Sequence, residues 1–282
     1  MKRLYHLFIY SNCYTVVVIA ALIVSSNYLY YSSFVLHIAD WFILSGTLFL
    51  YTLHRLYALY KKPNSSIHRL QKAAEIKNSI IVLCGIGLAT SIITGFYLTK
   101  EEVAKMIPVI VLGALYSFPV FKVFNLPALR EIPILKPFII ALTVAYATTF
   151  ALLPVNAAVL SLFILRFLFL SAVTLPFDIR DITIDKNEKI KTPAVLLGVQ
   201  KTKNTALLFN AVFTGVNITV YLFTDLYSFS VLIAFWLSEF YTSYYIYKIN
   251  KHQNDSYYTY HFEGGIILQS ILVIAADLFV RF

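Results

Sequence analysis

Charged residues and cysteine are both scarce in this chain. Only 13% of its 282 residues are charged, whereas about 25% is typical of a soluble domain. This shortage excludes a soluble globular protein of the usual composition. The two cysteines, Cys13 and Cys84, both lie inside long apolar segments. A disulfide is therefore not expected, and two cysteines are too few for a structural zinc site.

Long apolar runs take up most of the length instead. Hydrophobic residues make up 59% of the chain, and its mean hydropathy is +0.74. Nine runs approach the roughly 20 residues that an α-helix needs to cross a bilayer, at 7–26, 34–53, 79–98, 106–121, 136–155, 157–176, 204–223, 228–248 and 264–282. They are too long and too uniformly apolar for barrel strands. The sequence therefore predicts an all-α polytopic membrane bundle of about nine transmembrane helices, with residues 1–282 forming one domain.

The basic residues orient this bundle. Of the 23 lysines and arginines, 19 fall at the N-terminus or in four segments that should share its side of the membrane, at 54–77, 122–136, 177–203 and 248–263. The positive-inside rule makes that side cytoplasmic, which predicts a cytoplasmic N-terminus and a C-terminus outside. The first apolar run is longer than the core of a usual signal peptide, so we expect it to remain as the first span.

These features predict a multi-pass protein of the cell membrane, in the inner or cytoplasmic membrane of a bacterium. The formal net charge of +9 mainly reflects topology. It also favours contact with anionic lipid headgroups and with diphosphates. Nothing in the sequence indicates nucleic-acid binding.

Three carboxylates stand together directly after the sixth apolar run, in a chain with only 14 acidic residues. Asp178, Asp181 and Asp185 have a spacing that puts them on one face of a helix. Gathered carboxylates need a balancing cation. Mg²⁺ suits them, because it binds one or two carboxylates and completes its shell with phosphate oxygens and water. The alternative is a solvated helix at a membrane exit, whose acids pair with neighbouring basic residues such as Arg180 and Lys186.

The other long cytoplasmic loop, at 54–77, is almost purely basic. Its six Lys and Arg residues, among them Arg55, Lys61 and Arg69, face a single acid, Glu75. A phosphorylated ligand held between the two loops, with Mg²⁺ on the acidic side, would satisfy both. We therefore expect the working face of the protein to be cytoplasmic.

The acidic segment resembles the second aspartate motif of the UbiA superfamily of membrane prenyltransferases. The matching residues are Arg180, Asp181, Asp185, Thr192 and Gly198, at a spacing close to that of the family motif. The stretch Leu115-Tyr116-Ser117-Phe118-Pro119 and the pair Leu135-Lys136 also resemble the family's stretch around the fourth and fifth helices.

The resemblance implies a nine-helix enzyme that transfers an isoprenyl group from a prenyl diphosphate to a small lipophilic or aromatic acceptor, with Mg²⁺ as cofactor. It makes Asp181 and Asp185 the catalytic residues and, together with Asp178, the metal ligands. The residues that we expect to bind the substrate are Arg55, Lys61, Arg69, Tyr116 and Lys122.

One part of the family pattern is absent. Family enzymes carry a first aspartate motif at the end of the second helix, whereas residues 51–61 contain no carboxylate here. His54 and Arg55 stand in that region instead. Arginine binds phosphate bidentately without a metal. Either cationic side chains hold the diphosphate directly, or the chemistry has been lost.

Two other functions stay open on the sequence. A non-catalytic relative that binds lipid or acts as a scaffold would explain the missing first motif. A small membrane transporter would use the two intramembrane charges, Arg166 and Glu239, as a relay, whereas the expected arrangement is a buried ion pair between helices. Against a transporter, the sequence shows no internal repeat and no matched pair of helices broken by Gly or Pro.

Overall fold

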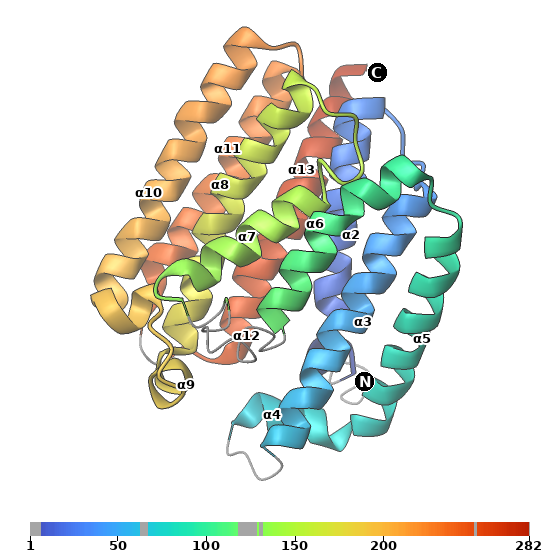
Figure 1. The fold of residues 1–282 in the computed structure, drawn as a ribbon. Coiled ribbons are helices and arrows are strands. Elements are labelled where there is room, and N and C mark those ends of the chain that lie inside the picture. The colour runs from blue at the N-terminus through green and yellow to red at the C-terminus, as the bar shows by residue number, and fades with distance from the viewer. Residues whose placement is uncertain (1–6, 63–66, 118–128, 130–131, 251–252, 282) are drawn as a thin grey trace. The chain divides into compact units, whose positions relative to one another are not determined.

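The computed structural model describes residues 7–62, 67–117, 129, 132–250 and 253–281. Within these residues the secondary structure is helical, with no strand. Helices lie over all nine predicted spans (Figure 1). The predicted all-α polytopic bundle is confirmed. The chain divides into two compact units, residues 1–20 with 35–105 and residues 21–34 with 106–282.

The first unit is built around helices α3 (Ile38–Lys61) and α5 (Lys77–Phe96), which pack closely. At Gly87 a Cβ atom would come within 2.7 Å of the backbone nitrogen of Phe49, and Ser91 donates a hydrogen bond to Ser45 across the same interface at 3.1 Å. Small residues of this kind let membrane helices approach each other. The helices of this unit are α3 (Ile38–Lys61), α4 (His68–Glu75) and α5 (Lys77–Phe96), together with the first part of α2 (Cys13–Tyr31) and the first turn of α6 (Lys100–Ser117).

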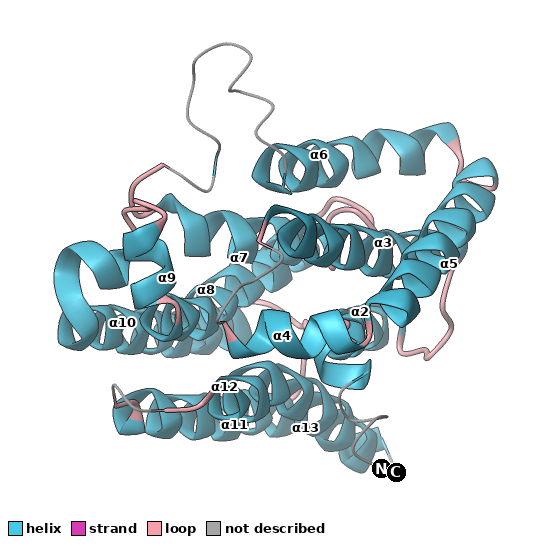
Figure 2. Ribbon diagram, turned by 90° about the horizontal axis from the view of Figure 1, so that it is seen from below, coloured by secondary structure: helices cyan, strands magenta, loops and turns pink. Residues whose placement is uncertain are grey.

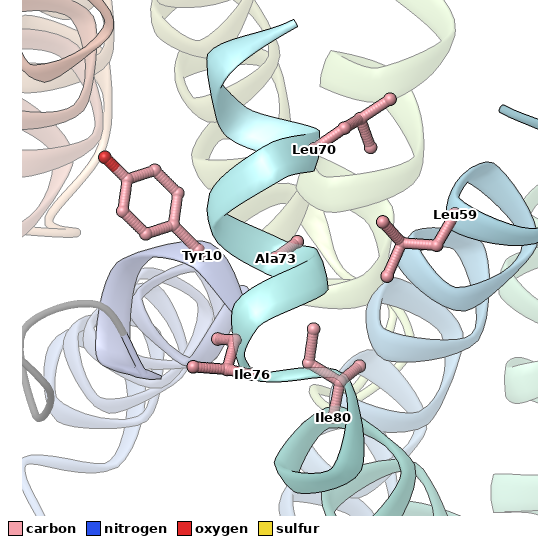
Figure 3. Packing of buried hydrophobic residues seen from close by; sticks show 6 residues of the cluster. All are labelled: Tyr10, Leu59, Leu70, Ala73, Ile76 and Ile80. Carbon is pink, nitrogen blue, oxygen red and sulfur yellow. The ribbon is translucent and has the colours of Figure 1, made fainter. Parts of the chain in front are cut away.

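Helix α4 is short and amphipathic, and its apolar face closes one end of this unit (Figure 3). Leu70 and Ala73 of α4 are buried against Leu59 at the end of α3 and Ile80 in α5. Tyr10 packs on the same cluster from the segment before α2. Burying this face holds α4 to the helices on either side of it.

The second unit is centred on α8 (Ala157–Arg180), on which its neighbours α7, α10 and α11 pack (Figure 1). Phe169 of α8 contacts Phe213 of α10, which in turn contacts Phe235 of α11, with 5.8 Å between ring centroids in each pair. Such aromatic pairs stabilise helix packing beyond their buried area. The remaining elements are α7 (Leu135–Ala147), α9 (Ile182–Asn187), α10 (Pro193–Phe223), α11 (Phe229–Lys248), α12 (Asp255–Tyr258), η3 (Thr259–Glu263) and α13 (Gly264–Arg281).

Six helical segments are long and apolar enough to cross a membrane, among the residues that the structure describes. They are Cys13–Tyr31, Ile38–Lys61, Lys77–Phe96, Ala157–Arg180, Pro193–Phe223 and Asp255–Val280. The protein is therefore a multi-pass membrane protein. The number of nine crossings and the sides of the two termini stay predictions.

The structure corrects the pairing expected for the two intramembrane charges. Arg166 is buried in α8 and donates hydrogen bonds to the Leu22 carbonyl at 2.8 Å and to the hydroxyls of Ser26 and Ser25 at 2.6 and 3.1 Å. Glu239 instead accepts a hydrogen bond from Thr214. The predicted Arg166–Glu239 pair is wrong, because a guanidinium with five donors finds enough neutral oxygens close by on α2.

Candidate functional site

Helix α8 carries the acidic motif out of the helical core, and the motif does not lie on one continuous helix. Helix α8 runs through Pro176 and ends at Arg180. Asp181 separates it from the short helix α9, which continues to Asn187 at the same end of the unit as α12 (Figure 2). The spacing rule for one helical face therefore does not hold across Asp181, and the three carboxylates take two different directions.

Asp178 and Asp185 converge on one ammonium group. The Lys136 Nζ lies 3.3 Å from Asp178 Oδ1 and 2.9 Å from Asp185 Oδ2, and it donates to the second Asp185 oxygen at 3.1 Å. Asp178 and Asp185 are only 2% and 3% exposed. The second oxygen of Asp178 is buried and accepts no hydrogen bond from the residues that the structure describes. Two almost fully buried carboxylates thus share one cation and still leave one acceptor unsatisfied.

The backbone around Lys136 is fixed by the loop that follows the motif. Ile134, just before α7, has a left-handed backbone with φ of 67°. Its N–H donates to the Lys191 carbonyl at 2.9 Å. This bond ties the start of α7 to the 188–192 segment and brings Lys136 to the carboxylates.

Asp181 has a separate partner. Its two oxygens accept hydrogen bonds from Arg180 Nε at 2.9 Å and Nη2 at 3.0 Å. The Arg180 guanidinium also lies over the rings of Phe177 at 4.7 Å and Tyr258 at 5.9 Å from their centroids. The bidentate geometry and the two rings hold both side chains in place.

Burial shifts the pKa of one carboxyl of the site. In α9, burial raises the pKa of the Asp185 carboxyl above its ordinary value, and the ammonium of Lys136 opposes that shift. Desolvation disfavours the charged carboxylate, whereas a nearby positive charge favours it. The ionised form of Asp185 thus depends on a cation beside it.

The donor set fits a Mg²⁺ ion held by two carboxylates. Within the described part of the chain, no three His, Cys, Asp or Glu side chains lie close enough together to form a metal site. Mg²⁺ needs only one or two carboxylates when phosphate oxygens and water complete its shell. Asp178 and Asp185 already converge on a cation, and the unsatisfied Asp178 oxygen adds a free ligand atom. The ligand roles of Asp178, Asp181 and Asp185 stay predictions.

The residues expected to bind the substrate fall in different parts of the chain. Arg55, Lys61 and Arg69 belong to the first unit, whereas the carboxylates belong to the second. Arg55 donates to Asn12 at 2.7 Å, and Lys61 lies over the Tyr57 ring.

Tyr116 and Lys122 are the other two residues expected at the substrate. Tyr116 lies in the last turn of α6 in the second unit and is half-buried. Lys122 lies outside the described residues.

The sequence indicates Lys136, like Lys122, as a residue that could reach a diphosphate, but it does not predict that Lys136 pairs with the carboxylates. It stands 49 residues from Asp185 along the chain, and its position at the start of an apolar run has an ordinary explanation in the positive-inside rule. Only the position of the residue, at the cytoplasmic end of a predicted span facing the motif loop, could have indicated the contact.

Comparison with known proteins identifies the fold. No family model matches the chain, and no curated protein sequence matches it. A UbiA homologue from Archaeoglobus fulgidus, solved with GPP and Mg²⁺, superposes with a TM-score of 0.64 over 96% of this chain and 99% of that chain, at 16% sequence identity. The chain has the UbiA fold.

Two further structures with the UbiA fold cover the chain almost completely. The Archaeoglobus fulgidus homologue bound to DMAPP and Mg²⁺ gives a TM-score of 0.61 at 16% identity over 98% of each chain. A structure of digeranylgeranylglyceryl phosphate synthase gives 0.58 at 16% identity, over 99% of this chain and 98% of that one. The fold implied by the aspartate motif is thereby confirmed.

Proposed function

We propose that this protein is a Mg²⁺-dependent membrane prenyltransferase that moves an isoprenyl group from a prenyl diphosphate to a small lipophilic or aromatic acceptor. The observation that carries the proposal is the convergence of Asp178 and Asp185 on one cation at the end of α8. Two structures of the same fold hold a short prenyl diphosphate, GPP or DMAPP, together with Mg²⁺. The carboxylate pair and the fold support the same chemistry.

The chain's own residues supply binding and electrostatics in this proposal. Asp178 and Asp185 hold the metal, and Asp181, oriented by Arg180, completes the acidic motif. When bound, Mg²⁺ provides positive charge that stabilises the diphosphate as it leaves. The basic residues that neutralise the diphosphate are Arg55, Lys61, Arg69 and Lys122.

The reaction breaks the bond between the allylic carbon and the diphosphate oxygen, and the electron pair leaves with the diphosphate. The allylic cation is captured by an electron pair of the acceptor, which then loses a proton to the departing diphosphate. Tyr116 is the residue expected to offer an aromatic face that stabilises positive charge. The burial of Asp178 supports a site that holds little water.

The carboxylate end of α8 faces the cytoplasm in this proposal, and the host membrane is a bacterial cytoplasmic membrane. The 19 basic residues on one predicted side support that orientation.

A non-catalytic lipid-binding or scaffold protein is the second candidate. Two observations favour it: residues 51–61 contain no carboxylate, and Lys136 already neutralises part of the remaining acidic site. Such a protein would bind a prenyl diphosphate and leave it intact.

The test is Mg²⁺-dependent release of diphosphate from geranyl, farnesyl or geranylgeranyl diphosphate by the purified, detergent-solubilised protein, with lipid extract as acceptor source. We expect the Asp181→Asn/Asp185→Asn double variant to lose on the order of 10²-fold or more in rate, because the charge that develops on the leaving diphosphate would lose its stabilising cation. Asp225→Asn, exposed in the 224–228 connection, is the matched control and should keep its rate. Binding without release would select the non-catalytic candidate.

A further inference from the structure

Lys136 is the one cation that the described structure places between Asp178 and Asp185. It takes three of their four oxygens, as both Asp185 oxygens and one Asp178 oxygen lie within 3.3 Å of its Nζ. Mg²⁺ binds carboxylate oxygens at about 2.0–2.1 Å. A metal on the same oxygens would lie next to the ammonium, and the two like charges would repel each other.

We propose that Lys136 couples metal binding to diphosphate binding. In the ligand-free protein its ammonium stands where the metal would be held. A diphosphate draws the ammonium onto its own oxygens and thereby frees both carboxylates for Mg²⁺. This inference rests on the proposed function, since it requires a diphosphate ligand at the site.

The charges of the three side chains support an exchange of this kind. When both are ionised, Asp178 and Asp185 carry two negative charges, and Lys136 balances one of them. Removing Lys136 from the pair leaves two negative charges, which one divalent cation balances.

Lys136 is held less firmly than the other cation of the site. Its side chain is 16% exposed, while those of Asp178 and Asp185 are 3% and 4% exposed. A lysine side chain is a flexible four-carbon stem with a point charge. Arg180 is held by two hydrogen bonds to Asp181 and by two aromatic rings. The backbone at Ile134 stays anchored to Lys191 while the lysine side chain swings.

Coupling of this type is reciprocal. If a diphosphate raises the affinity for Mg²⁺, then Mg²⁺ raises the affinity for the diphosphate by the same factor, typically about 5- to 150-fold. Removing Lys136 should remove its share of the coupling. The metal should bind more tightly without diphosphate, and the diphosphate should improve metal binding less than in wild type, by its direct ligation of Mg²⁺ alone.

The experiment is calorimetric titration of Mg²⁺ into wild-type protein and Lys136→Met in detergent, each with and without geranyl S-thiolodiphosphate as a slowly reacting probe. We expect Mg²⁺ to bind Lys136→Met at least about 5-fold more tightly than wild type without the probe. We expect the probe to tighten Mg²⁺ binding by a larger factor in wild type than in Lys136→Met, because direct ligation of Mg²⁺ by phosphate oxygens acts in both proteins. Lys136→Gln serves as a second variant if the methionine variant does not fold. Lys105→Met is the control, because Lys105 pairs with the exposed Glu101 in a different part of the chain.

Equal Mg²⁺ affinity of wild type and both Lys136 variants overturns the coupling, as does a probe that leaves wild-type Mg²⁺ affinity unchanged. If wild type turns over prenyl diphosphate and still shows either result, only the coupling fails. If wild type neither binds the probe nor releases diphosphate, the proposed function fails with it.

Discussion

Asp185 is buried in α9 with a raised pKa, and that fact makes metal binding depend on pH. A metal ligand must be deprotonated, so a proton and Mg²⁺ compete for the same carboxyl. An aspartate with an ordinary pKa of about 3.9 would be fully available above pH 5 or so. In this site the competition extends to higher pH.

We predict that stabilisation by Mg²⁺ grows as the pH rises through the raised pKa of Asp185. The sign follows from linkage. The metal-free fold holds the proton more tightly than the unfolded chain, so the raised pKa contributes stability at low pH that is lost as the pH rises through it. Mg²⁺ replaces that contribution at high pH. Thermal unfolding midpoints with and without Mg²⁺, measured from pH 4 to 8, check this. Asp185→Asn should flatten the profile, and a profile equally steep in the variant would contradict the assignment.

Arg166 leads to a second prediction about a single side chain. Arg166→Met removes a donor from the Leu22 carbonyl and from the Ser25 and Ser26 hydroxyls. The Leu22 carbonyl still accepts from the Ser25 and Ser26 hydroxyls, but the two hydroxyl oxygens lose their donor, and a buried acceptor without a donor costs about 1–3 kcal/mol. We expect a loss of unfolding free energy of that order, measured by unfolding in detergent. Because Arg166 bonds to α2 and Glu239 bonds to Thr214, Arg166→Met and Glu239→Gln should be additive within about 0.5 kcal/mol. A larger coupling energy would show that Arg166 and Glu239 interact directly, which would contradict the separate partners described above.

Among the helices, α5 carries two glycines that form a matched pair. A Cβ at Gly87 would lie 2.7 Å from the Phe49 nitrogen and 3.0 Å from its Cα, whereas nothing lies within 4 Å of a Cβ at Gly85. We predict that Gly87→Ala destabilises the α3–α5 pair by about 1–3 kcal/mol, as overpacking does. Gly85→Ala should gain up to about 1 kcal/mol from helix propensity. Unfolding of the two variants in detergent separates the effects, and similar changes in both would show that the close approach is not a constraint.

The helices were predictable from the sequence, and the site only in part. Apolar runs near 20 residues make the helices because a bilayer leaves no other way to satisfy the backbone. Spacing along one helix predicted that Asp178, Asp181 and Asp185 converge, but the helix ends at Arg180 and starts again after Asp181. Asp178 and Asp185 therefore meet Lys136, while Asp181 turns to Arg180. The contact with Lys136 depends on how α7 packs on α8, which no local pattern encodes.

Over the full length of the protein, the distribution of charge makes a prediction about topology. With nine crossings, the N-terminus and the C-terminus lie on opposite sides of the membrane. Single cysteines placed near either end in a variant lacking Cys13 and Cys84 should differ in labelling by a membrane-impermeant maleimide. We expect label at the C-terminal position in intact cells and at the N-terminal position only after lysis. Labelling of both positions from the same side would require an even number of crossings.

The bonds from α2 to Arg166 also bear on how the protein is made. A charged residue near the centre of a membrane helix costs about 2.5–3.5 kcal/mol on scales derived from translocon insertion. The oxygens of Leu22, Ser25 and Ser26 that accept from Arg166 lie on α2, which the ribosome synthesises long before α8. Insertion of α8 into the bilayer should therefore cost least when α2 is already inserted and can accept the hydrogen bonds of Arg166. An early helix, α2, would thus assist the insertion of α8, which has the largest buried share among the described spans.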